Sequence, residues 1–126
     1  MQIAQKNFYK KLLGRVGEKK AGEFLRKKGY TILKTNYKTY CGEIDLIAKD
    51  GENIVFIEVK TRSSTKYGRP CEAVKKYKRN HIIDSAKYYN YKNKIKNIPI
   101  RFDIIEVLLC NSNYKVNHIK QAFSKT

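Results

Sequence analysis

Apolar residues recur along this chain with two different periods, and the change of period separates predicted helices from predicted strands. Residues 7–28 carry apolar side chains at steps of three and four, the spacing of one helix face. The members of this stripe are Leu13, Val16, Gly17, Ala21, Phe24 and Leu25. Gly29 follows as a C-terminal stop. A second helix is predicted over residues 71–91, because Pro70 suits the first turn of a helix.

Short runs rich in Ile and Val predict strands. These runs are residues 30–37, 42–49, 53–61 and 100–109, with a weaker one at 114–119. Asp50-Gly51 predicts a hairpin between the second and third strands. The order is helix, three strands, helix, and one or two strands. It predicts a single α/β domain over residues 1–126, with a mixed β-sheet flanked by helices.

Hydropathy and cysteine content narrow the class of protein. No apolar run approaches the roughly 18 residues that a membrane span needs, and the basic N-terminus lacks the apolar segment of a signal peptide. We therefore expect a cytoplasmic protein with no membrane partner. The three cysteines are widely spaced and odd in number, which favours reduced thiols over disulfides or a zinc site.

The charge is strongly positive and unevenly distributed. The chain has 28 Lys and Arg against 11 Asp and Glu, a formal net charge of +17. This charge predicts a nucleic-acid partner, although the lysine-rich composition of an AT-rich genome is an alternative source of it. Residues 41–60 reverse the trend, with five acids against two cations. A bound divalent cation would reverse the sign of such an acidic segment and let it hold phosphate.

The predicted hairpin brings two of these acids together. Glu58 and Lys60 are two residues apart in a strand, so they share a face. A two-residue hairpin loop pairs Asp45 with Phe56, and a four-residue loop pairs Asp45 with Glu58. Both registers place Asp45 on the face of Glu58 and Lys60. A three-residue loop with a bulge would shift this pairing.

Each charged residue near this face has more than one interpretation. A salt bridge from Lys60 accounts for one acid, whereas a divalent metal accounts for both Asp45 and Glu58. Glu18 lies at the edge of the apolar stripe of the first helix, where it either reaches the sheet or pairs within the helix. The predicted inward stripe of the second helix includes His81, Ile82, Ser85 and Tyr89. Lys78 lies at the centre of this stripe, so it pairs with an acid, contacts phosphate or snorkels to solvent.

The motif around the hairpin matches a known pattern. Gly42-Glu43-Ile44-Asp45, followed after thirteen residues by Glu58-Val59-Lys60, resembles the signature of the PD-(D/E)xK nuclease superfamily. The wider pattern comprises Gly17-Glu18, Ala21, Gly29-Tyr30, Asn36, GEIDLIA at 42–48, FIEVKTR at 56–62, Gly68, Pro70, Lys78 and Arg101-Phe102-Asp103. It resembles the bacterial YraN-like family, which is similar to archaeal Holliday-junction resolvases. Ile44 replaces the usual proline of the superfamily, which supplies no ligand.

The resemblance implies a restriction-endonuclease-like core and a metal-dependent endonuclease that hydrolyses phosphodiester bonds of DNA, most naturally branched or structured DNA. It implies Mg²⁺ or Mn²⁺ at Asp45 and Glu58, with Glu18 as a further ligand, direct or through water. It places Lys60 beside the nucleophilic water. By analogy with resolvases, it also implies a symmetric homodimer. The alternative is a non-catalytic nucleic-acid-binding module that keeps the nuclease fold.

The remaining candidates are DNA contacts and structural pairs. The basic loop after the third strand offers phosphate contacts and one ring for stacking on a base, against the alternative of an ordinary solvated loop. Its candidate residues are Arg62, Lys66, Tyr67 and Arg69. Arg101 and Asp103 share a strand face and are predicted to pair, and His118 is predicted to be structural.

Overall fold

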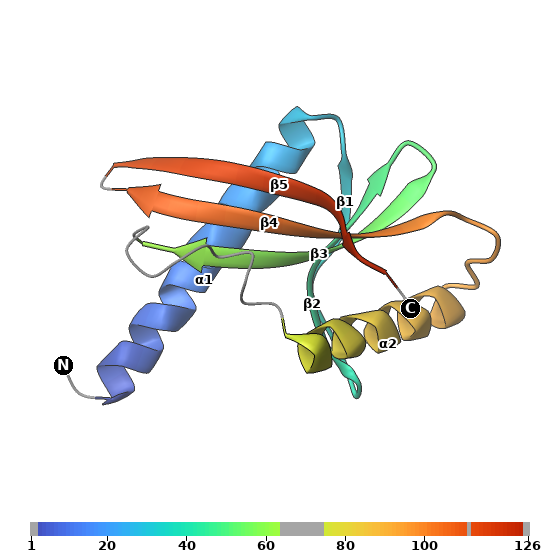
Figure 1. Cartoon of the computed structure of the whole chain (residues 1–126), viewed down its shortest axis with the longest axis horizontal. Coiled ribbons are helices and arrows are strands. Elements are labelled where there is room, and N and C mark those ends of the chain that lie inside the picture. The colour runs from blue at the N-terminus through green and yellow to red at the C-terminus, as the bar shows by residue number, and fades with distance from the viewer. Residues whose placement is uncertain (1–2, 64–74, 111, 125–126) are drawn as a thin grey trace.

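The computed structural model describes residues 3–63, 75–110 and 112–124, with side chains from residue 8 onward (Figure 1). It contains two helices and five strands. In chain order these are α1 (Ile3–Lys27), β1 (Thr31–Thr39), β2 (Gly42–Asp50), β3 (Asn53–Arg62), α2 (Lys76–Lys92), β4 (Ile100–Cys110) and β5 (Asn113–Phe123). The predicted order of elements is confirmed.

All five strands form one sheet in the order β1-β2-β3-β4-β5. Neighbouring strands are antiparallel except for β3 and β4, which are parallel. A parallel pair needs a crossover connection, and α2 lies in the connection between β3 and β4. The sheet is therefore mixed, and the α/β class is confirmed.

The helices cover opposite faces of the sheet. α1 packs mainly on β3, and α2 packs mainly on β2. The core under α1 includes Ala21, Leu25, Leu46, Val55 and Ile57, and the core under α2 includes Ile47, Phe56, Ile82, Tyr89 and Phe102. Because both faces are covered, β3 is apolar on both sides, as strands in the middle of α/β sheets usually are.

The hairpin between β2 and β3 adopts one of the two predicted registers. Lys49 pairs with Ile54, and Asp50 pairs with Asn53. Gly51 has a φ of 60°, a backbone conformation that glycine adopts without steric cost. This is the register of the predicted four-residue loop, and its ladder ends at Leu46 opposite Ile57, one position before Asp45 and Glu58.

The inward face of α2 differs in part from the prediction. Ile82, Ser85 and Tyr89 are buried as expected, but His81 is exposed. Ile83 and Ala86 face the sheet as well, because rotating α2 toward them buries more apolar surface. The start of the second predicted helix, including Pro70, lies outside the described residues.

The first half of α1 extends past the sheet. Phe8, Tyr9 and Leu12 are exposed there, and in Figure 1 this end of the helix projects away from the strands. Although α1 is 25 residues long, neither α1 nor α2, as described, combines the length and apolarity needed to cross a bilayer.

Candidate active site

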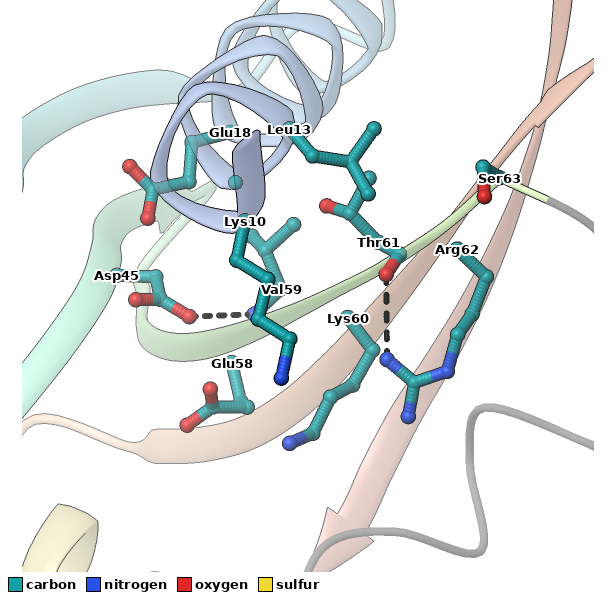
Figure 2. A pocket seen from close by; sticks show the side chains of 11 residues that line it. Lys10, Leu13, Glu18, Asp45, Glu58, Val59, Lys60, Thr61, Arg62 and Ser63 are labelled. Atoms are coloured by element: carbon teal, nitrogen blue, oxygen red, sulfur yellow. Dashed lines mark hydrogen bonds between the residues drawn. The ribbon is translucent and has the colours of Figure 1, made fainter. Parts of the chain in front are cut away.

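Charged side chains from three elements line one open pocket of about 480 Å³ (Figure 2). Its acids are Glu18 of α1, Asp45 of β2 and Glu58 of β3, and its cations are Lys10, Lys60 and Arg62. These residues are separated by up to 52 positions in the sequence. The fold therefore brings the predicted acids and the predicted lysine into one place.

The pocket forms where β2 and β3 separate. Their backbone ladder ends at Leu46, and the next side chain, Asp45, accepts a hydrogen bond through Oδ2 from the Val59 N–H at 2.8 Å. A carboxylate thus replaces the carbonyl that would otherwise satisfy this buried amide. Ile44 packs under α2 whereas Leu46 packs under α1, although residues two apart normally share a face. This rotation of β2 turns Asp45 toward Glu58.

A glycine lets α1 approach the same point. A Cβ atom at Gly17 would overlap the Thr61 side chain of β3. The missing side chain allows the helix backbone to lie directly against the strand, as glycine does where two backbones meet closely. The next residue, Glu18, is therefore held at the pocket. Of the two predicted alternatives, it reaches the sheet and does not pair with a described residue of the helix.

Glu58 is a buried carboxylate that the surrounding residues satisfy poorly. Its side chain is 6% exposed, and no described residue hydrogen-bonds to the buried Oε2 atom. The Lys78 Nζ atom lies 3.8 Å from Oε2, a long ion pair. Burial, followed by the charge of Asp45, raises the pKa of Glu58 to about 8, although Lys78 and Lys60 act in the opposite direction.

Glu18 experiences the same crowding of negative charge. Burial and then the charge of Asp45 raise its pKa to about 7, despite a hydrogen bond from Asn36 that lowers it. Two neighbouring acids with raised pKa values indicate that the pocket holds more carboxylate than its own cations neutralise. Such perturbed groups in a cleft are candidates for a functional site.

The donor atoms fit a hard divalent cation. Carboxylate oxygens are preferred ligands of Mg²⁺ and Mn²⁺, and the unsatisfied Glu58 oxygen beside Asp45 is such a donor. Within the described ranges, no three His, Cys, Asp or Glu side chains form a compact metal cluster. Mg²⁺ is usually held by one or two carboxylates and keeps several waters. Asp45 and Glu58 suit this arrangement, with Glu18 adding a ligand directly or through water.

The predicted nucleic-acid contacts fall into three groups. Arg62 lines the pocket, where its Nη1 atom donates a hydrogen bond to the Thr61 carbonyl oxygen at 3.2 Å. Lys78 lies outside the pocket lining but pairs with Glu58, which is the ion-pair alternative predicted for it. Lys66, Tyr67 and Arg69 lie outside the described residues.

One charged residue of the pocket was not anticipated. Lys10 lines it two turns before Glu18, with Gly14 between them at steps of four residues. Residues spaced by four lie on one face of a helix. The sequence shows this spacing, but the predicted apolar stripe lies on the neighbouring helix face and does not include Lys10.

A second charged cluster lies away from the pocket, around the carboxylate of Asp103. Asp103 is completely buried and receives hydrogen bonds from Arg101, the Gln121 N–H and His118, the last at 2.6 Å. Burial acts to raise the pKa of Asp103, but the hydrogen bonds from His118 and Arg101 outweigh it and hold the pKa below its usual value. The predicted pairing of Arg101 with Asp103 is confirmed, and His118 belongs to the same structural network.

Comparison with known proteins identifies a family. Residues 17–107 match the profile of "Uncharacterised protein family UPF0102", a span that contains all three acids of the pocket. A UPF0102 protein of Clostridioides difficile (strain 630) is 51% identical over 110 residues, covering 87% of this chain and 95% of the relative. A UPF0102 protein of Caldicellulosiruptor saccharolyticus is 47% identical over 116 residues, covering 90% and 98%. A third, from Caldanaerobacter subterraneus subsp. tengcongensis, is 49% identical over 121 residues, covering 94% and 99%.

Proposed function

The chain belongs to the UPF0102 family, and we propose that it is a metal-dependent endonuclease that hydrolyses phosphodiester bonds of branched or otherwise structured DNA. One observation carries the proposal: Asp45 and the unsatisfied, buried Glu58 share a pocket with Lys60. The spacing of these residues resembles the signature of PD-(D/E)xK nucleases. An α/β sheet whose strands separate at the acids supports that resemblance.

The pocket residues have distinct proposed roles. Asp45 and Glu58 would hold Mg²⁺ or Mn²⁺, and Glu18 would add a ligand directly or through water. The ion, when bound, would polarise the scissile phosphate and lower the pKa of a bound water. Lys60 lies beside the acids, where its ammonium group orients the attacking water and offsets charge that develops on the phosphate. The water oxygen bonds to phosphorus as the ester P–O bond breaks, and the leaving oxygen gains a proton.

The charge of the chain supports DNA as the partner. A protein of +17 attracts a polyanion through counterion release, independent of sequence. Lys10 and Arg62 also line the pocket, so they would contact phosphates near the cleaved bond. Lys66, Tyr67 and Arg69 follow directly after β3 in the chain and remain proposed DNA contacts.

A non-catalytic DNA-binding module is the second candidate. The ion pair between Lys78 and Glu58 favours it, because this lysine partly neutralises the acid without any metal. The module would bind DNA in a salt-sensitive manner and leave it intact. The two candidates therefore differ in whether Asp45 and Glu58 matter for cutting or only for local structure.

The deciding experiment combines substrates, metals and variants. The purified chain is incubated with junction, flap, single-stranded and linear duplex DNA and with RNA, in Mg²⁺, Mn²⁺ or EDTA. Asp45→Ala and Glu58→Ala are the test variants, and Glu52→Ala is the matched control, since it removes an exposed acid at the tip of the same hairpin. Metal-dependent cutting that both test variants lose and the control keeps supports the nuclease. Tight binding without cutting in any metal supports the module.

A further inference from the structure

One face of α2 presents a row of aromatic side chains to solvent. Tyr77, His81, Tyr88 and Tyr91 are separated by steps of four, seven and three residues, so they lie on one helix face. Tyr77 is 62% exposed and Tyr91 is 83% exposed. A contiguous row of exposed aromatic rings is typical of a binding surface, whereas single exposed rings are common on any protein.

The hairpin between β1 and β2 adds a fifth ring. Tyr40 is 88% exposed, and its ring centroid lies 5.6 Å from that of Tyr88 in an edge-on arrangement. Thr39 fixes the hairpin to α2 through a 2.9 Å hydrogen bond between its hydroxyl and that of Ser85. Figure 1 shows this turn passing beside α2. We call the five residues Tyr40, Tyr77, His81, Tyr88 and Tyr91 the aromatic ridge.

Lysines flank the aromatic ridge and determine what it can bind. Lys78, Lys87 and Lys92 lie on α2 beside it, and the Lys92 Nζ atom is 5.7 Å from the centroid of the Tyr88 ring. Asp84 is an acid within the same row. The lysines outnumber the acid on this face, so its net positive charge complements a polyanion. It opposes pairing with a second copy of the same face, since lysines would then meet lysines.

The ridge begins next to the candidate active site. Lys78 lies 3.8 Å from Glu58, the pocket acid, and also lines a shallow hollow of about 430 Å³ together with Lys38 and His81. Lys78 therefore links Glu58 to this hollow, whose lining also includes the acid Glu43 and which reaches His81 in the first half of the ridge. A nucleic-acid strand whose phosphate is held at Glu58 would pass Lys78 and Lys38 on its way to the exposed rings.

We propose that the aromatic ridge stacks on unpaired bases next to the cleaved bond, so that the substrates are DNA structures with a single-stranded segment, such as flaps and splayed arms. The inference rests on the proposed nuclease function and specifies its substrate class. Bases in a duplex are hidden in their own stack, whereas unpaired bases expose faces to aromatic rings. From Tyr77 to Tyr91 the helix rises about 21 Å. That length matches roughly six nucleotides at about 3.4 Å each.

The test measures binding in EDTA, so that it does not depend on cutting. Fluorescence anisotropy compares a duplex carrying a single-stranded flap with a blunt duplex of the same sequence. The variant pair Tyr40→Ala with Tyr91→Ala removes two rings that are almost fully exposed, and Tyr40→Phe with Tyr91→Phe is the matched control that keeps them. We expect the alanine pair to weaken flap binding about tenfold or more, because two contacts between a ring and a base are lost. Blunt-duplex binding should be unchanged.

A fluorescent base analogue gives an independent readout of stacking. 2-Aminopurine placed in the flap should be quenched by the unchanged protein and by the phenylalanine pair, but not by the alanine pair. Equal binding of flap and blunt duplex by all variants would overturn the inference while leaving the proposed metal-dependent cleavage of branched DNA intact. Ridge-dependent flap binding without cutting in any metal would uphold the stacking of unpaired bases on the ridge and refute the nuclease. A dimer that the alanine pair dissociates, in sedimentation velocity, would show that the ridge is a subunit interface and overturn the inference.

Discussion

Replacing Glu58 with glutamine is expected to stabilise the metal-free protein and to remove its response to Mn²⁺. Burial and the Asp45 charge raise the pKa of Glu58 from 4.5 to about 8, so the folded state favours the protonated acid. Stability is therefore fully retained below pH 4.5 and falls as the pH rises toward 8. At about 1.4 kcal/mol per pH unit, the loss by pH 7 is roughly 3 kcal/mol. Glutamine stays neutral and avoids this loss.

The assay is urea unfolding at pH 5 and pH 7, in EDTA and in Mn²⁺. In EDTA, Glu58→Gln should exceed the unchanged chain in stability by an amount that grows with pH. Its loss of the ion pair costs little, because the Lys78 side chain is 37% exposed and remains hydrated. Mn²⁺ at about 100 times its Kd should stabilise the unchanged chain by about 2.7 kcal/mol and the variant far less. Glu52→Gln, at the exposed hairpin tip, is the control.

The opposite result would refute the reasoning. If Glu58→Gln is less stable than the unchanged chain at pH 7 in EDTA, and Mn²⁺ stabilises neither, the acid serves only as the structural partner of Lys78. The pocket would then be a folding feature, and the metal-dependent mechanism would lose its main support.

Two further predictions concern the stability of the fold. Gly17→Ala should destabilise the chain by about 1–3 kcal/mol, because its methyl group would overlap Thr61. Gly14→Ala has open space around it and should be neutral or stabilising by up to about 1 kcal/mol. Thermal unfolding of both variants checks this, and equal effects would contradict the close approach of α1 to β3 at Gly17. Asp103 has a lowered pKa, so its contribution to stability is complete above its usual pKa of 3.8 and is lost as the pH falls through the lower folded value. Asp103→Asn should lower the free energy of unfolding by about 3–5 kcal/mol at pH 7 and weaken its fall at acidic pH. An unchanged fall at acidic pH would show that the hydrogen bonds from His118 and Arg101 do not stabilise the Asp103 carboxylate.

The local chemistry of the hairpin made much of the site predictable. Alternation along β3 placed Glu58 and Lys60 on one face, and Asp50-Gly51 placed a turn at the observed position. Both registers weighed for the hairpin brought Asp45 to that face. The turn and the shared face of Glu58 and Lys60 were predictable because turn preference and strand periodicity act over a few residues. Asp45 reaches Glu58 through the rotation of β2, which periodicity alone does not give.

Other features of the site depended on packing between distant elements. Glu18 had two equally good interpretations by spacing, and the contact of Gly17 with Thr61 decided between them. The pairing of Lys78 with Glu58 likewise required the placement of α2 across the sheet.

The chain by itself determined which residues form helices and strands, and which side chains carry charge, because these properties arise from neighbours a few positions away. Only the tertiary structure decided that β2 rotates at Asp45, that no described residue hydrogen-bonds to the Oε2 atom of Glu58, and that His81 faces solvent. Burial and long-range contact set these outcomes, since the cost of desolvating a carboxylate depends on every element packed around it.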